Sequence, residues 1–130
     1  MEKPRLNHIR QNRIVNAIQS ARSEVRWRPG NPARRMLKRK LRGHLPGCAT
    51  SDDCERVILT ALRDDRAQVY VYWHDGTPYV ALVAVVQPRH WLVVFTMEGL
   101  IESAYVVERP NRYLHKPVFE LIGSLSEVLL

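Results

Sequence analysis

Three short runs rich in β-branched and aromatic residues fill the chain between Tyr79 and Arg109. A Gln-Pro-Arg break and a Met-Glu-Gly turn separate them, which is the pattern of consecutive antiparallel strands. Along the last run, side-chain alternation predicts that two hydroxyl groups share one face of the sheet. The residues expected on that face are Ile101, Ser103, Tyr105 and Val107.

A fourth strand is expected just before these runs. From Gln68 to Trp73, Val and Trp alternate with Tyr, as in a strand with one buried face. The sequence His74-Asp75-Gly76-Thr77 follows and is typical of a tight hairpin turn, so we assign His74 to the turn. The expected sheet is a four-stranded antiparallel meander.

Helices are expected both before and after these strands along the chain. Residues Leu6 to Val25 carry apolar side chains at helical spacing, and the Pro- and Gly-rich stretch that begins at Trp27 ends this segment. The segment from Ala33 to Arg42 has a thin apolar edge and is read as a short basic helix or a basic arm. A third helix begins at Thr50 or Ser51, which is suited to cap it. Its apolar face consists of Cys54, Val57, Ile58, Ala61 and Leu62.

The C-terminal segment, from Val118 to Leu130, has apolar residues at helical spacing and predicts a closing helix on the sheet. The fold class is therefore α+β, with N-terminal helices, a four-stranded antiparallel β-meander and a C-terminal helix. We divide the chain into a basic N-terminal helical segment, residues 1–42, and an α+β part, residues 43–130. With 130 residues, both belong to one compact domain.

Positive charge is concentrated at the N-terminal end. The net charge is +7, but residues 1–45 hold 13 Lys and Arg against two acids, whereas residues 46–130 hold 7 against 11. Such a division favours an anionic partner such as nucleic acid, with a solvated helix face, an acidic protein or anionic lipid as alternatives. The densest basic cluster is Arg34, Arg35, Lys38, Arg39, Lys40 and Arg42.

Nothing in the chain predicts a membrane protein, a secreted protein or a metal site. No apolar run approaches the ~18 residues needed to span a bilayer, and the charged N-terminus lacks a signal-peptide core. Two cysteines are too few for a disulfide scaffold. His44, Cys48 and Cys54 supply three zinc-type ligands where a structural site needs four. We expect a cytoplasmic protein with no membrane association, no metal and no cofactor.

Two groups of residues carry candidate chemistry. His44 lies in a loop, where an imidazole is suited to general acid or base catalysis, although a solvated surface histidine is the plainer interpretation. Ser103 and Tyr105 are suited to bind phosphate oxygens together, with Arg109 adding a charge-assisted contact. The alternative for this pair is an ordinary polar sheet edge. The loop with Arg112, Tyr113, His115 and Lys116 is suited to close over the same end of the sheet, although a solvated polar loop is the plainer interpretation.

These features resemble the barnase, EndoU, colicin and RelE-like nuclease superfamily, in particular its phage-associated and polymorphic-toxin branch. The resemblance covers about residues 40–115. It rests on a histidine loop, a capped helix, and a strand motif that reads Ile101-Glu102-Ser103-Ala104-Tyr105.

The resemblance implies a metal-independent endoribonuclease that activates a ribose 2′-hydroxyl and leaves a 2′,3′-cyclic phosphate. His44 would be its general base or acid, and Ser103 and Tyr105 would position the phosphate. Arg109 has no counterpart in the family motif, and we add it because the charge that develops on the phosphorane needs a cation. The implied partners are RNA, with transfer RNA as one candidate, and an acidic inhibitor or antitoxin protein. The alternative hypothesis is a non-catalytic nucleic-acid-binding or protein-binding module that uses residues 33–42.

Overall fold

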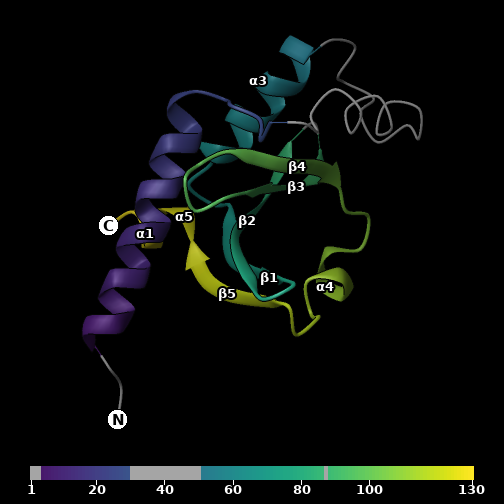
Figure 1. Cartoon of the computed structure of the whole chain (residues 1–130). Coiled ribbons are helices and arrows are strands. Elements are labelled where there is room, and N and C mark those ends of the chain that lie inside the picture. Colours follow the sequence, from purple (N-terminus) through teal and green to yellow (C-terminus); the bar gives the residue numbers. More distant parts are fainter. Residues whose placement is uncertain (1–3, 30–50, 87) are drawn as a thin grey trace.

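A five-stranded antiparallel sheet forms the centre of the molecule (Figure 1). The computed structural model describes residues 4–29, 51–86 and 88–130. The strand order is β4-β3-β2-β1-β5. The strands are β1 (Gln68–His74), β2 (Thr77–Val86), β3 (Arg89–Phe95), β4 (Ile101–Val106) and β5 (Phe119–Ser124). The α+β class is confirmed, but the four-stranded layout is not, because a fifth strand pairs with β1.

Two of the expected helices are present. Helix α1 (Pro4–Ser23) ends two residues earlier than predicted, and α3 (Ser51–Leu62) begins at one of the two expected capping residues. Their apolar stripes are buried, as the periodicity predicted. The buried residues are Ile14, Ala17, Ile18 and Ala21 in α1 and Val57, Ile58, Ala61 and Leu62 in α3.

A C-terminal helix is present, but it is much shorter than predicted. Phe119–Ser124 is a strand, and only the short helix α5 (Leu125–Val128) follows it. Pairing with this segment satisfies the backbone groups along β1, which would otherwise be a bare sheet edge. Gly123 stands at a shift in the pairing register, with a φ of +151° that other residues rarely adopt. Long-range pairing thus outweighed the local helical spacing.

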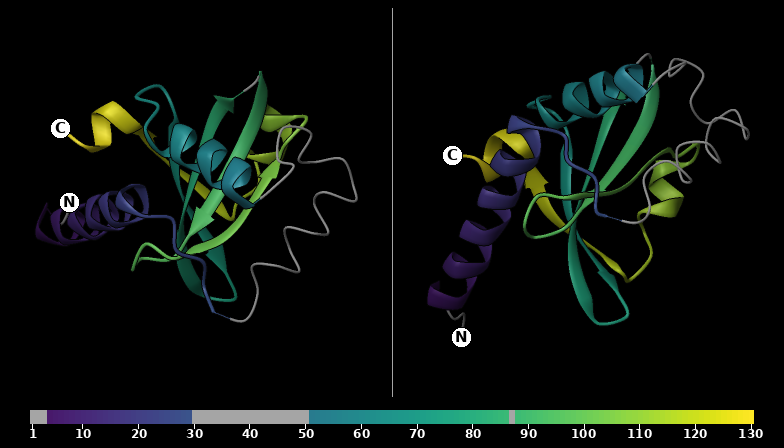
Figure 2. Two further views of the ribbon diagram at one scale, coloured as in Figure 1. Left: turned by 90° about the horizontal axis from the view of Figure 1, so that it is seen from above. Right: turned by 45° about the horizontal axis from the view of Figure 1, so that its top comes forward.

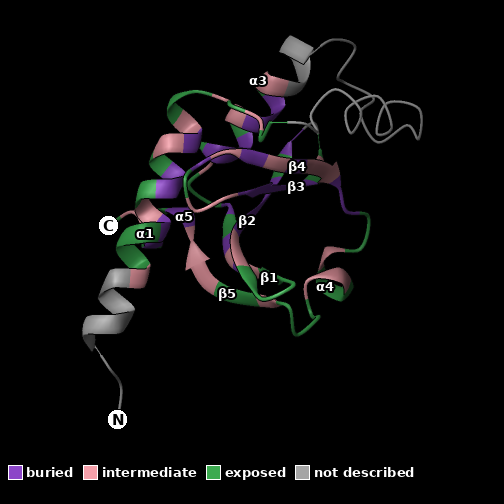
Figure 3. Ribbon diagram, viewed as in Figure 1, coloured by how far each residue is buried: buried purple, intermediate pink, exposed green. Residues whose placement is uncertain are grey.

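The two faces of the sheet pack against different parts of the chain. Helices α1, α3 and α5 lie on one side, where the main apolar core is formed (Figures 2 and 3). The opposite, concave face carries a smaller apolar cluster rimmed by partly buried aromatic side chains. The short helix α4 (Pro110–Tyr113) stands beside this face, within the predicted loop. The partly buried aromatic residues are Tyr70, Tyr72, Tyr79, Tyr105, Tyr113 and Phe119.

A β-bulge in β4 decides which side chains reach the concave face. Val94 pairs with Ser103, but Phe95 pairs with Ile101, so that Glu102 is the extra residue. Ile101 therefore belongs to the helix-side core, and its predicted placement beside Ser103 and Tyr105 is wrong. In a regular ladder Glu102 would stand opposite Phe95 on the apolar helix side. The bulge places an apolar side chain there instead.

Candidate functional site

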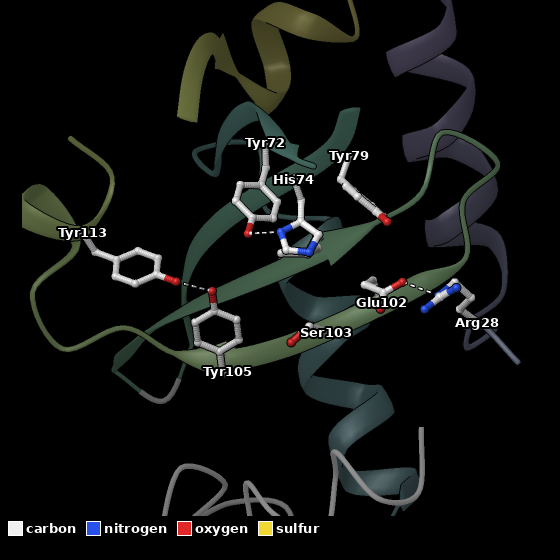
Figure 4. A pocket seen from close by; sticks show the side chains of 9 residues that line it. Arg28, Tyr72, His74, Tyr79, Glu102, Ser103, Tyr105 and Tyr113 are labelled. Carbon is white, nitrogen blue, oxygen red and sulfur yellow. Dashed lines mark hydrogen bonds and ion pairs between the residues drawn. The ribbon is translucent and has the colours of Figure 1, made fainter. Parts of the chain in front are cut away.

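A hollow of about 440 Å³ opens on the concave face of the sheet. We call it the central hollow. Its volume lies within the ~300–1,000 Å³ typical of small-ligand sites. The lining residues are Arg28, Tyr72, His74, Tyr79, Val94, Glu102, Ser103, Tyr105 and Tyr113. It thus gathers a carboxylate, a guanidinium, an imidazole and several hydroxyls (Figure 4).

The curvature of the sheet brings its distant strands to one site. Tyr72 and His74 come from β1, and Glu102, Ser103 and Tyr105 come from β4, although β2 and β3 lie between these strands. Antiparallel sheets coil, so side chains on the concave face of separated strands converge. The hollow therefore has two walls that carry different chemical groups.

Arg28 reaches the hollow because the chain after α1 runs along the outer edge of β4. Trp27 forms an isolated parallel bridge with Ile101. The Arg28 backbone N–H donates to the Ile101 carbonyl at 2.9 Å, and the Ile101 N–H donates to the Arg26 carbonyl at 2.7 Å. These bonds fix Arg28 beside the bulge. The stretch that the sequence assigned only to a helix stop thus supplies the cation of the hollow.

Glu102 and Arg28 form an ion pair. Arg28 Nε lies 2.5 Å from Glu102 Oε1. The Glu102 side chain is 11% exposed and the Arg28 side chain 48% exposed, so the carboxylate lies deeper and the guanidinium reaches solvent. An incoming anion can therefore meet the guanidinium before it meets the carboxylate.

On the opposite wall, His74 is held between a phenol and a carboxylate. Its Nδ1 lies 3.5 Å from the Tyr72 hydroxyl, and its Nε2 lies 3.4 Å from Asp75 Oδ2. The turn after it is the predicted two-residue hairpin turn, with Asp75 at φ +50° and Gly76 at φ +78°. His74 is nevertheless the last residue of β1, and its ring lines the hollow.

The hydroxyl of Tyr72 stays protonated at neutral pH. Burial raises the pKa of Tyr72, and the nearby Tyr113, Asp75 and Tyr79 raise it further. The Tyr105 and Tyr113 hydroxyls lie 2.6 Å apart and share a hydrogen bond. Tyr113 comes from α4, so this bond ties the loop after β4 to the sheet face. Neutral phenols can donate hydrogen bonds to an anion.

The structure brings together only some of the predicted site residues. Ser103 and Tyr105 both line the central hollow, whereas Arg109 lines a neighbouring hollow beyond Tyr105. His44 and the basic cluster, residues 34–42, lie outside the described residues.

Seven lining residues were not assigned to the site from the sequence: Arg28, Tyr72, His74, Tyr79, Val94, Glu102 and Tyr113. The sequence placed Tyr113 in a loop near this end of the sheet. The alternation of side chains along β1 placed Tyr72 on the face opposite the core valines. Glu102 lies inside the strand motif itself, but its orientation depends on the bulge. Arg28 depends on a contact between segments far apart in the sequence, which carries no local signal.

Among the described residues, no three His, Cys, Asp or Glu side chains lie close enough together to hold a metal ion. None of the helices in this part of the chain is long and apolar enough to cross a bilayer. No family model, curated protein or solved structure matches the chain. The central hollow is therefore the feature on which a functional proposal rests.

Proposed function

We propose that the protein is a metal-independent endoribonuclease whose reaction takes place in the central hollow. The observation that carries this proposal is the facing arrangement of Glu102, paired with Arg28, and His74. Cleavage by a 2′-hydroxyl needs a base on one side of the phosphorus, an acid on the other, and a cation for the charge that develops between them. The two walls of the hollow offer these groups.

In the proposed reaction Glu102 accepts the proton of the ribose 2′-hydroxyl. The oxygen then attacks the adjacent phosphorus, and the bond from phosphorus to the 5′-oxygen breaks. The imidazolium of His74 donates a proton to that leaving oxygen. The products are a 2′,3′-cyclic phosphate and a 5′-hydroxyl, so the protons and bonds balance.

The remaining groups stabilise the phosphate. Arg28 extends from the carboxylate toward solvent and provides positive charge where the pentacoordinate phosphorus gains negative charge. The hydroxyls of Ser103 and Tyr105 donate hydrogen bonds to its non-bridging oxygens. These two residues thus keep the role that the family resemblance implies. Arg28 takes the role that we expected Arg109 to fill as the cation for the developing charge.

The test is cleavage of total RNA by the purified protein in the presence of EDTA, with the chemical ends of the products determined. Glu102→Gln keeps the shape of the side chain but removes the base, and we expect the rate to fall by about 10²- to 10⁴-fold. Glu98→Gln is the matched control, because Glu98 is an exposed acid in the turn before β4 and does not line the hollow. It should cleave at the wild-type rate.

Two histidine variants decide which imidazole acts. We expect His74→Ala to lose activity to a similar extent, whereas loss only in His44→Ala would transfer the acid role to the residue that the family resemblance favours. A wild-type protein that leaves RNA intact, or a Glu102→Gln variant that cleaves normally, would refute the nuclease.

A second candidate is RNA binding without cleavage. It is favoured by the aromatic side chains of the concave face, where Tyr72 stacks on Phe119 with ring centroids 4.9 Å apart. Aromatic rings on an open sheet are common platforms for unpaired bases. This candidate predicts RNA that is bound but intact, with Glu102→Gln indistinguishable from wild type.

A further inference from the structure

A second hollow, of about 500 Å³, adjoins the central hollow. We call it the basic hollow. The lining residues are Tyr105, Val106, Val107, Glu108, Arg109, Arg112, Tyr113 and Lys116. Tyr105 and Tyr113 line both hollows, so their hydrogen-bonded hydroxyls form a ridge between them. A chain molecule that crosses this ridge would occupy both.

The basic hollow combines positive charge with apolar walls. Its lining includes three cations, Arg109, Arg112 and Lys116, and one acid, Glu108. The floor includes Val107, which is 5% exposed. This pairing of apolar surface and surplus positive charge matches a nucleotide, whose base has flat apolar faces and whose phosphate is an anion.

The backbone fixes the cations in place. The Tyr113 N–H donates to the Arg109 carbonyl at 2.9 Å, which closes a single helical turn. Residues three apart across such a turn are neighbours, so the turn brings Arg109 and Arg112 together. The Lys116 ammonium lies 4.3 Å from the centroid of the Tyr113 ring, a cation–π contact that holds the third cation at the ridge.

We propose that the basic hollow is the subsite for the nucleotide next to the cleaved phosphodiester, with Arg109 and Arg112 contacting its phosphate. This proposal rests on the proposed function for the identity of its ligand. It gives Arg109 a role in binding the RNA strand in place of a role at the reacting phosphorus. It also explains why the cation after β4 lies outside the central hollow.

The test measures the affinity of the intact protein for uncleavable 2′-O-methyl RNA of one, two and four nucleotides, each with a 3′-phosphate. The mononucleotide fills one hollow, and the longer strands can fill both. In Arg109→Ala/Arg112→Ala we expect the tetranucleotide to bind about tenfold more weakly or worse, because charge-assisted contacts to phosphate are lost. Binding of the mononucleotide should be unchanged.

The salt dependence gives a second readout. Each phosphate neutralised on a single strand contributes ~0.7 to the slope of log affinity against log salt. Loss of the one phosphate contacted by Arg109 and Arg112 should therefore reduce the slope by about 0.7. The control, Arg13→Ala/Arg66→Ala, removes the same charge from exposed positions that line neither hollow. It should keep the wild-type affinity for the tetranucleotide.

Three results would overturn the subsite: no gain in wild-type affinity with strand length, equal loss for mononucleotide and tetranucleotide in the Arg109/Arg112 variant, or equal loss in the control variant. If inorganic phosphate displaced strands of every length at the same concentration, the basic hollow would be a simple anion site. This result would also overturn the proposed subsite. Because these ligands cannot be cleaved, the result is independent of catalysis. A protein that shows the length effect but leaves natural RNA intact would refute the nuclease and keep the subsite.

Discussion

Gly99 stands at the closest approach between the β3–β4 turn and α1, and Gly99→Ala tests how tightly this contact holds the fold. Its φ is +88°, a conformation that costs a non-glycine residue about 1–2 kcal/mol. An added Cβ would lie 2.7 Å from both Cβ and Oγ of Ser20. Overpacking of this kind costs a further 1–3 kcal/mol or so. We therefore expect the free energy of unfolding to fall by about 2–5 kcal/mol.

Gly76→Ala separates the two contributions. Gly76 has a similar φ of +78°, but an added Cβ there meets no atom within 4 Å. Only the backbone cost of about 1–2 kcal/mol applies to it. The reduced freedom of the unfolded chain is common to both substitutions and cancels in the comparison. The difference between the two variants, about 1–3 kcal/mol, is the steric part.

The assay is urea unfolding at equilibrium, with unchanged m-values taken as the sign that only stability has changed. A double-mutant cycle with Ser20→Gly, which removes both crowded atoms, should recover the steric part in the Gly99→Ala background. The same substitution should add independently to Gly76→Ala. Equal losses in Gly99→Ala and Gly76→Ala, or an additive Ser20 cycle, would show that α1 shifts to accommodate the methyl group and would refute the reasoning.

Two further predictions concern hydrogen bonds that the structure defines. Tyr113→Phe keeps the ring but removes the 2.6 Å hydrogen bond to Tyr105. We expect the free energy of unfolding, measured in urea, to fall by about 0.5–1.5 kcal/mol. Adding Tyr105→Phe in a double variant should lower it little further, because the same bond is already lost. Hydrogen bonds from the backbone N–H and the hydroxyl of Ser124 lower the pKa of Glu127 below its ordinary value of 4.5. The stabilisation from this carboxylate is therefore present above pH 4.5 and is lost as the pH falls through the lowered pKa. In the Glu127→Gln variant, the urea midpoint should fall less steeply as the pH is lowered into the acid range. Near neutral pH, the variant's pH profile should keep the wild-type shape.

Local periodicity was sufficient to predict the elements that bury one regular face. The stripes of α1 and α3 and the alternation in β1 face the main core, and each was readable within a short window. The Asp75-Gly76 turn was equally local, because both residues adopt positive φ. For these segments tertiary packing and local preference agree.

The C-terminal segment shows where periodicity misled. Its apolar residues fit a helix, but the capping box at the start of α5, formed by Ser124 and Glu127, marks a helix beginning at residue 125 rather than 118. That signal was present in the sequence, and it would have freed the preceding residues for a strand. The pairing of that strand with β1 is a long-range contact that no local pattern in the sequence indicates.

The central hollow owes its chemistry to departures from regular structure. The bulge in β4 removes Glu102 from the position opposite Phe95, and the irregular chain after α1 lays Arg28 along the strand edge beside it. His74 is presented at the very end of β1, where the hairpin turns. A regular sheet would leave the carboxylate facing the apolar core and the cation in solvent. The sequence therefore predicted four of the five strands and the shared face of the two hydroxyls, whereas the charged groups of the site follow from how the irregular segments meet.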